Sequence, residues 1–104
     1  MPVYVMRVSF QTVPGRRDEA VSYVKQIGQR MEALGLGSSG RIVSAVFASP
    51  GAPDIYAEFE VEDLGATEEG FVKLFEDPEF QAINQKFVAF LTDAAKTELY
   101  MVEE

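Results

Sequence analysis

The sequence predicts a single small α+β domain whose elements follow the order strand, helix, strand, strand, helix region, strand. Three observations support this prediction. Residues 3–12 and 54–62 alternate apolar and polar side chains with a period of two, as half-buried strands do. Residues 16–34 and 67–91 instead repeat apolar side chains every three or four positions, as one face of a helix does. No internal boundary divides the 104 residues, so residues 1–104 are expected to fold around one core.

The first half of the chain is predicted to contain a strand, a long helix and the start of a second strand. Pro14 and Gly15 end the strand of residues 3–12, and a helix follows over roughly residues 16–34. Glycines then interrupt the chain between residues 35 and 40, after a helix and before a strand. A phosphate-binding loop needs the opposite order, with a strand before it and a helix N-terminus after it. This segment is therefore predicted to be a plain linker.

Two strands, a helix region and a last strand complete the domain. Residues 42–49 and 54–62 form strands joined by a tight connection. Both alternating sets of residues 42–49 are apolar enough to be buried, so the inward face of this strand stays open. Thr67 is predicted to cap the next helix, and Asp77 and Pro78 restart it as cap and first residue, because proline has no N–H to lose there. The last strand covers roughly residues 97–103.

This element order is the ferredoxin-like βαββαβ pattern. Right-handed crossovers give a four-stranded antiparallel sheet in the order 4-1-3-2, with the helices on one face. The strand residues expected beneath the helices are Tyr4, Met6, Val8, Phe10, Ile55, Phe59, Leu99 and Met101. Those expected on the opposite face are Val3, Val5, Arg7, Ser9, Tyr56, Glu58, Glu98, Tyr100 and Val102. The second set is too apolar to be fully exposed to solvent and too polar to form a hydrophobic core. A second sheet is therefore expected to cover it, which implies a homodimer.

Composition excludes several classes of function. Seventeen acidic residues against nine basic ones give a net charge of −8, and the basic residues are scattered, so neither nucleic acid nor an anionic membrane is an expected partner. The chain has no cysteine and no histidine, which removes thiol nucleophiles, Cys- or His-ligated metals and Ser-His-Asp catalysis. No apolar run approaches about 18 residues, and no signal-like segment starts the chain. A cytoplasmic protein without a metal or a tightly held cofactor is expected.

Two segments resemble known proteins. Residues 13–16, Val-Pro-Gly-Arg, run into residues 18–20, Asp-Glu-Ala, and residues 74–80, Leu-Phe-Glu-Asp-Pro-Glu-Phe, break the second helix region. With the predicted fold, these features resemble the dimeric α/β-barrel superfamily, nearest to its antibiotic biosynthesis monooxygenase-like and NIPSNAP-like proteins. The resemblance implies a closed barrel formed by two sheets. It also implies activities that range from cofactor-independent monooxygenases to isomerases and haem-degrading enzymes. The haem-binding histidine and the cavity tryptophan of some members have no counterpart here.

Polar residues near the centre of the second face form the candidate site. The predicted strand order places Arg7 beside Glu58 on one side and beside Glu98 or Tyr100 on the other. In a catalytic interpretation, Arg7 binds an anionic or carbonyl oxygen, Glu58 acts as a base with a raised pKa, and Tyr56 or Tyr100 donates a hydrogen bond. Proton abstraction next to a carbonyl is the reaction that suits these groups. The other residues expected to contact a substrate are Ser9, Glu98, Tyr100 and Phe75.

The same residues have a structural interpretation, in which Arg7 and Glu58 form an ion pair that fixes the sheet register or spans the dimer interface. Two functions therefore stay open. One is a cofactor-independent monooxygenase, isomerase or cyclase acting on an aromatic or carbonyl-bearing metabolite. The other is a noncatalytic ligand-binding or protein-interaction module. An enzyme needs an open cavity beside Arg7, whereas a structural dimer fills that space with side chains.

Overall fold

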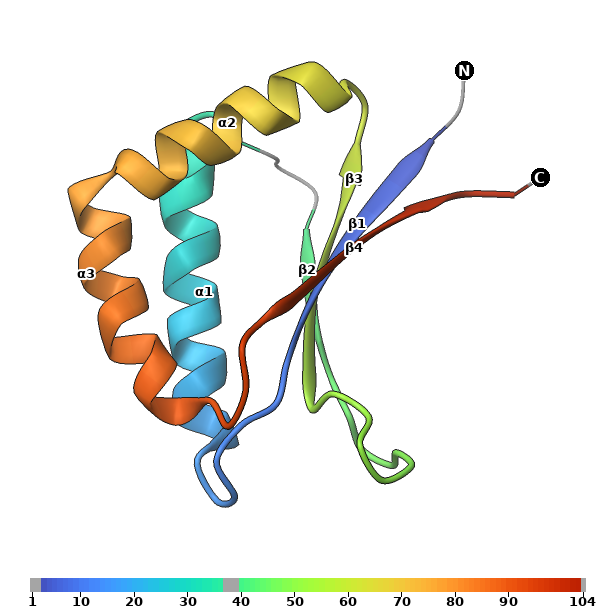
Figure 1. Cartoon of the computed structure of the whole chain (residues 1–104), viewed down its shortest axis with the longest axis vertical. Helices are drawn as coiled ribbons and strands as arrows, with labels where there is room; N and C mark the ends of the chain where they lie inside the picture. The colour runs from blue at the N-terminus through green and yellow to red at the C-terminus, as the bar shows by residue number, and fades with distance from the viewer. Residues whose placement is uncertain (1–2, 37–39, 104) are drawn as a thin grey trace.

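Four antiparallel strands form one sheet and three α-helices cover one of its faces in the computed structural model, which describes residues 3–36 and 40–103 (Figure 1). In chain order the elements are β1 (Tyr4–Phe10), α1 (Arg17–Ala33), β2 (Arg41–Ser44), β3 (Ile55–Val61), α2 (Leu64–Glu76), α3 (Pro78–Phe87), the 3-10 turn η1 (Val88–Phe90) and β4 (Lys96–Met101). The predicted α+β, ferredoxin-like class is confirmed. Part of the predicted glycine linker, residues 37–39, lies outside the described residues. None of the described helices is long and apolar enough to cross a membrane.

The strand order β2-β3-β1-β4 is the predicted order 4-1-3-2 read from the other edge. Arg7 of β1 lies opposite Glu58 of β3 and opposite Glu98 of β4, which confirms its predicted neighbours. Arg41 of β2 lies opposite Glu58 in turn. Residues that are directly paired across strands project from the same face of a sheet. All four side chains therefore stand on the face that the helices leave uncovered, which we call the open face.

The face beneath the helices holds the core. Phe10 packs edge-on against Phe87 of α3, with 5.1 Å between ring centroids, and Ile55 lies beside them in the same buried cluster. From α1, Ala20 and Val24 belong to this cluster. Among the described strand residues, the positions on this face carry no charged side chain: Tyr4, Met6, Val8, Phe10, Ile42, Ser44, Ile55, Ala57, Phe59, Val61, Thr97, Leu99 and Met101. The predicted division of the sheet into two faces is confirmed.

The break between α2 and α3 is tied to α1. Asp77 caps α3, where its Oδ2 accepts a hydrogen bond from the Phe80 N–H, and Pro78 is the first helical residue, as predicted. The Arg30 guanidinium donates to both Asp77 oxygens, with both N to O distances 2.7 Å. These bonds to Arg30, together with the bond from the Phe80 N–H, lower the pKa of Asp77 to about 2. The break is thus an anchored junction of three helices.

The predicted cap of the second helix is wrong. The carboxylate of Asp63 accepts from the Ala66 N–H at 3.1 Å, so α2 starts at Leu64. The hydroxyl of Thr67 donates instead to the main-chain carbonyl of Asp63, at 2.9 Å. Aspartate and threonine both suit a cap, and here the earlier aspartate takes that position, which gives α2 one additional turn.

The second strand is shorter than the predicted residues 42–49, because β2 ends at Ser44. The Ala45 N–H still donates to the Asp54 carbonyl oxygen, but β3 begins only at Ile55, so residues 46–53 form a loop. Val46 and Phe47 in this loop are almost fully exposed, at 99% and 98%. The orientation that the sequence left open is now settled. Ile42 packs toward the core, and Val43, opposite Tyr56, projects from the open face.

Ile55 provides a test of this core, because it is fully buried in β3. Ile55→Val is expected to lower the free energy of unfolding by about 1 kcal/mol, since it removes a buried methyl group and leaves a small cavity. Urea denaturation measures the loss as a lower midpoint at an unchanged slope. Val72→Ala, on the exposed side of α2, is the control and is expected to change stability by less than about 0.5 kcal/mol. Equal losses in both variants would contradict this core.

Candidate functional site

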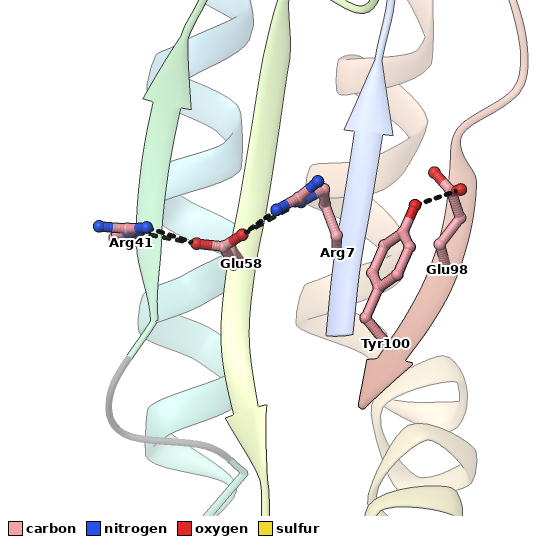
Figure 2. A network of polar contacts seen from close by, with 5 residues as sticks. All are labelled: Arg7, Arg41, Glu58, Glu98 and Tyr100. Atoms are coloured by element: carbon pink, nitrogen blue, oxygen red, sulfur yellow. Dashed lines mark hydrogen bonds and ion pairs between the residues drawn. The ribbon is translucent and has the colours of Figure 1, made fainter. Parts of the chain in front are cut away.

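Four charged side chains form a line across the open face, one from each strand (Figure 2). In spatial order they are Arg41, Glu58, Arg7 and Glu98, and we call them the polar row. Their charges alternate from positive to negative along the line. The alternation follows from the strand order, because β3 lies between β2 and β1, and β1 lies between β3 and β4.

Glu58 is bound by two guanidinium groups. Arg7 donates from Nε and Nη2 to Glu58 Oε1, at 3.1 and 2.6 Å. Arg41 binds the other oxygen, with its Nε 2.9 Å and its Nη2 2.8 Å from Glu58 Oε2. The Glu58 side chain is only 13% exposed, whereas that of Arg41 is 74% exposed. Both oxygens of a largely buried carboxylate are therefore satisfied by charged donors from the two neighbouring strands.

The expected raised pKa of Glu58 is wrong. Hydrogen bonds from Arg7 and Arg41 stabilise the ionised carboxylate and lower the pKa of Glu58, and this effect exceeds the opposing effect of burial. The same interaction with Glu58 raises the pKa of the Arg7 guanidinium. A carboxylate held in its ionised form by two cations is a weak proton acceptor. The geometry thus suits Glu58 to orienting Arg7 better than to abstracting a proton.

Two tyrosine rings enclose Arg7 from either side. The Arg7 Cζ atom lies 5.2 Å from the ring centroid of Tyr56 and 5.2 Å from that of Tyr100, within the range of cation–π attraction. The Tyr100 hydroxyl donates to Glu98 Oε2 at 2.7 Å, as Figure 2 shows, and this bond raises the pKa of Tyr100. Arg7 is therefore fixed by one ion pair and two rings, and its side chain remains 38% exposed.

The structure brings together most of the predicted site, and leaves one member apart. Ser9 lies on the same face of β1 as Arg7, and it is buried, with its Oγ 3.5 Å from the Lys96 carbonyl oxygen. Phe75 belongs to the helix layer on the other side of the sheet. It lies within a series of aromatic rings, 6.2 Å from Phe71 and 5.8 Å from Phe80 between centroids. Phe75 thus does not share a site with Arg7 in a single chain.

A hollow of about 300 Å³ lies between α2, the end of α1 and the end of β3. The apolar residues that line it include Met31, Leu36, Phe59, Val61 and Phe71, and the polar ones are Glu60, Glu62, Asp63 and Thr67. Neither this hollow nor a more open one lined by Thr12 and Asp54 includes Arg7. The sequence predicts the apolar face of the second helix region, to which Phe71 belongs. The sequence did not identify Met31 or Leu36 as lining residues, because their positions depend on how α1 ends beneath α2.

The hollow exists partly because α2 passes close to the segment after α1. Gly70 is buried in α2, and a Cβ atom at this position would lie 2.0 Å from Leu36 Cδ2. A glycine in the middle of a helix is a signal of such a close approach. Among the described residues, no group of three or more acidic side chains is arranged to hold a metal ion.

Comparison with known proteins identifies the fold. No family of known sequences matches the chain, and no curated protein matches it. Solved structures do match. A NIPSNAP family protein from Agrobacterium tumefaciens aligns with a TM-score of 0.69 at 17% identity, over 98% of this chain and 87% of that one. An antibiotic biosynthesis monooxygenase aligns with a TM-score of 0.63 at 13% identity, over 98% and 99% of the two chains.

A third match is a dimeric ferredoxin-like protein of unknown function from Thermobifida fusca, with a TM-score of 0.65 at 11% identity over 97% of this chain and 92% of that one. These alignments extend over nearly the whole chain, and they confirm the resemblance to NIPSNAP and antibiotic biosynthesis monooxygenase-like proteins that the sequence predicts. Because the identities are low, the likeness establishes the fold and leaves the activity open.

The two ion pairs of Glu58 predict how the pKa of this carboxylate changes when one cation is removed. A carboxylate with a lowered pKa in the folded state stabilises the fold above its ordinary pKa, and this contribution is lost as the pH falls through the folded value. Arg41→Gln removes one of the two cations, so the pKa of Glu58 is expected to rise toward the ordinary glutamate value. Carbon-detected NMR titration of the side-chain carboxyl measures this shift. Arg16→Gln, which removes a cation that pairs with Glu19, is the control. An unshifted Glu58 in Arg41→Gln would contradict the role of Arg41.

Proposed function

We propose that this chain is a small-molecule-binding protein that works as a homodimer, in which two sheets pack through their open faces. The observation that supports a homodimer is the balance of positive and negative charge on this face. Its charged residues are three basic and three acidic side chains: Arg7, Arg41, Lys96, Glu58, Glu60 and Glu98. The whole net charge of −8 therefore resides on other parts of the chain. Two copies repel one another over most of their surface, and the neutral open face is where they meet at least cost.

The apolar residues of the open face support the same assembly. Val43 and Tyr100 are 40% and 44% exposed, and Val3 and Val102 are similarly exposed at one end of the sheet. A sheet face that mixes large apolar side chains with paired charges is suited to packing against another sheet. The Thermobifida fusca neighbour is described as dimeric, which supports the same arrangement for this chain.

The hollow between α2 and the sheet is the better candidate for the ligand site. Its volume of about 300 Å³ is at the lower end of the range for small-molecule sites, and its lining combines apolar side chains with a few polar groups. Phe59 and Phe71, with 6.3 Å between their centroids, offer ring surfaces to an aromatic ligand. Thr67 offers a hydroxyl. A small aromatic or carbonyl-bearing metabolite is the ligand that this lining favours.

The polar row is the second candidate, and the observation that favours it is the enclosure of Arg7 by two tyrosines. In this alternative, Arg7 binds a carbonyl or anionic oxygen of the ligand, and Tyr56 or Tyr100 donates a hydrogen bond to it. Glu58 then holds Arg7, and Ser9 and Glu98 contact the rest of the ligand. The chain would act as a cofactor-independent monooxygenase, isomerase or cyclase, and the monooxygenase neighbour supports the first of these. If the polar row is only structural, the chain is a noncatalytic binding module.

Ligand binding by three variants distinguishes these sites. A panel of small aromatic and enolisable carbonyl compounds is screened by saturation-transfer NMR, and the Kd of each hit is measured by calorimetry. Ala66→Phe places a ring in the hollow and is expected to raise the Kd at least about tenfold, because the ring takes the volume of the ligand. Val72→Phe adds the same ring to the exposed side of α2 and is expected to leave the Kd unchanged.

Arg7→Ala completes the comparison. If Arg7→Ala abolishes binding in a folded dimer while Ala66→Phe does not, the ligand belongs to the polar row and the hollow is excluded. If Arg7→Ala dissociates the dimer and leaves the ligand bound, Arg7 is an interface residue. A panel without any hit against the wild-type chain would contradict the small-molecule function itself.

A further inference from the structure

We propose that the exposed side of α2 binds a basic amphipathic helix of another protein. This inference is independent of the ligand site proposed above, because other residues of α2, among them Ala66 and Thr67, line the hollow. The observation that supports it is a group of large apolar side chains beside carboxylates that pair with no cation. Six exposed residues form this surface, which we call the outer face of α2: Leu64, Glu68, Glu69, Val72, Phe75 and Glu76.

Val72 is the centre of the outer face. Residues three and four positions apart are neighbours on the surface of a helix. The residues at those distances from Val72 are Glu68, Glu69, Phe75 and Glu76. Leu64 lies about one turn before Glu68, so the outer face is a continuous surface about 17 Å long at a rise of 1.5 Å per residue.

The apolar side chains of the outer face meet solvent. Leu64, Val72 and Phe75 are 43%, 54% and 60% exposed, although Phe75 contacts the ring of Phe80. Large apolar side chains that are grouped on an exposed surface mark sites of interaction. Figure 1 shows α2 at the edge of the molecule, where a partner can reach it.

The carboxylates determine which partner fits this surface. Residues 62–79 contain seven acidic residues and one lysine, so they account for −6 of the net charge of −8. Arg30 pairs with Asp77 and Glu79 at the start of α3. Within the part of the chain that the structure describes, the three glutamates of the outer face take part in no ion pair.

These unpaired charges favour a cationic partner. A second copy that used the same face would bring like charges together, and an anionic membrane or a nucleic acid would be repelled in the same way. A helix with Lys or Arg beside an apolar stripe matches both features of the outer face. Its apolar side chains cover Val72 and Phe75, and its cations pair with the glutamates. The outer face is about as long as an average helix of about 11 residues.

Three synthetic peptides test this preference. The first is an amphipathic helix of about 18 residues made of Leu and Lys, long enough to form a helix on binding. The second has Glu in place of every Lys, and the third has the composition of the first in a scrambled order. The first peptide is expected to bind the wild-type chain at least about tenfold more tightly than either of the others, because it alone combines the apolar stripe with cations. Calorimetry measures each Kd, and NMR chemical-shift mapping locates the peptide at residues 64–76.

Two matched pairs of substitutions separate the effects of charge and of apolar contact. Glu69→Lys is expected to raise the Kd of the Leu-Lys peptide at least about threefold, whereas Asp93→Lys, at an exposed site after η1, is expected to change it less than about twofold. Val72→Ser is also expected to raise the Kd at least about threefold, whereas Val88→Ser, at a valine of η1 that is 52% exposed, is expected to leave it unchanged. Circular dichroism checks that each variant folds, and Glu69→Gln, with a smaller expected increase, replaces Glu69→Lys if that variant does not fold.

The results decide between the outer face and other surfaces. Preference for the Leu-Lys peptide, mapped to α2 and weakened by Glu69→Lys and Val72→Ser, supports the proposal. Equal binding of the scrambled or the Glu-containing peptide, or chemical-shift changes confined to the open face, would overturn it. If Val72→Ser instead weakens self-association of the chain, or its binding to phosphatidylcholine vesicles, the occupant is a second copy or a membrane and the proposal is wrong. Ligand binding in the hollow is measured separately, so a negative result here leaves the proposed function in place.

Discussion

The carboxylate of Glu58 is the group on which the arrangement of the open face depends. It takes hydrogen bonds from Arg7 on one neighbouring strand and from Arg41 on the other, so it links β1, β3 and β2 through side chains as well as through the backbone. Removing either arginine leaves a largely buried carboxylate with one cation, and removing Glu58 leaves two guanidiniums without the carboxylate that they share. The strand order and register place these residues, and this carboxylate binds the two cations on either side of it. Its lowered pKa also makes a positioning role more suitable for it than a role as a base.

Much of this arrangement was predictable because strands repeat with a period of two. The residues of the two faces were assigned from alternation alone, and the strand order 4-1-3-2 was enough to place Arg7 between Glu58 and Glu98. The sequence did not reveal Arg41, because residues 42–49 are apolar in both alternating sets and the strand was expected to begin one residue later. Without Arg41, the sequence predicts a raised pKa for Glu58. The second cation reverses that direction.

Other misassignments have similarly local causes. Asp63 and Thr67 are both good helix caps, and only the path of the chain after β3 determines that the aspartate takes this role. The hollow depends on the angle at which α2 crosses the sheet and on the close approach of Gly70 to Leu36, which are tertiary features. Phe75 was grouped with Arg7 although a helix residue and an open-face residue lie on opposite sides of the sheet. Alternation assigns faces reliably, whereas contacts between layers require the packing itself.

The two faces of the sheet thus differ in character. The helix side holds the core and a hollow of the size of a small ligand, while the open side is neutral, partly apolar and charge-alternating in a chain of net charge −8. The fold is shared with proteins of unlike or unknown function, so these local features have to identify the role of this chain.

The most direct test is the mass of the wild-type chain in solution, measured by sedimentation velocity across a range of concentrations at physiological salt. Burial of the open face against a second copy predicts a mass twice that of the 11.5 kDa chain. A species of 11.5 kDa up to the highest soluble concentration would contradict it, and would mean that the open face meets solvent or a different partner.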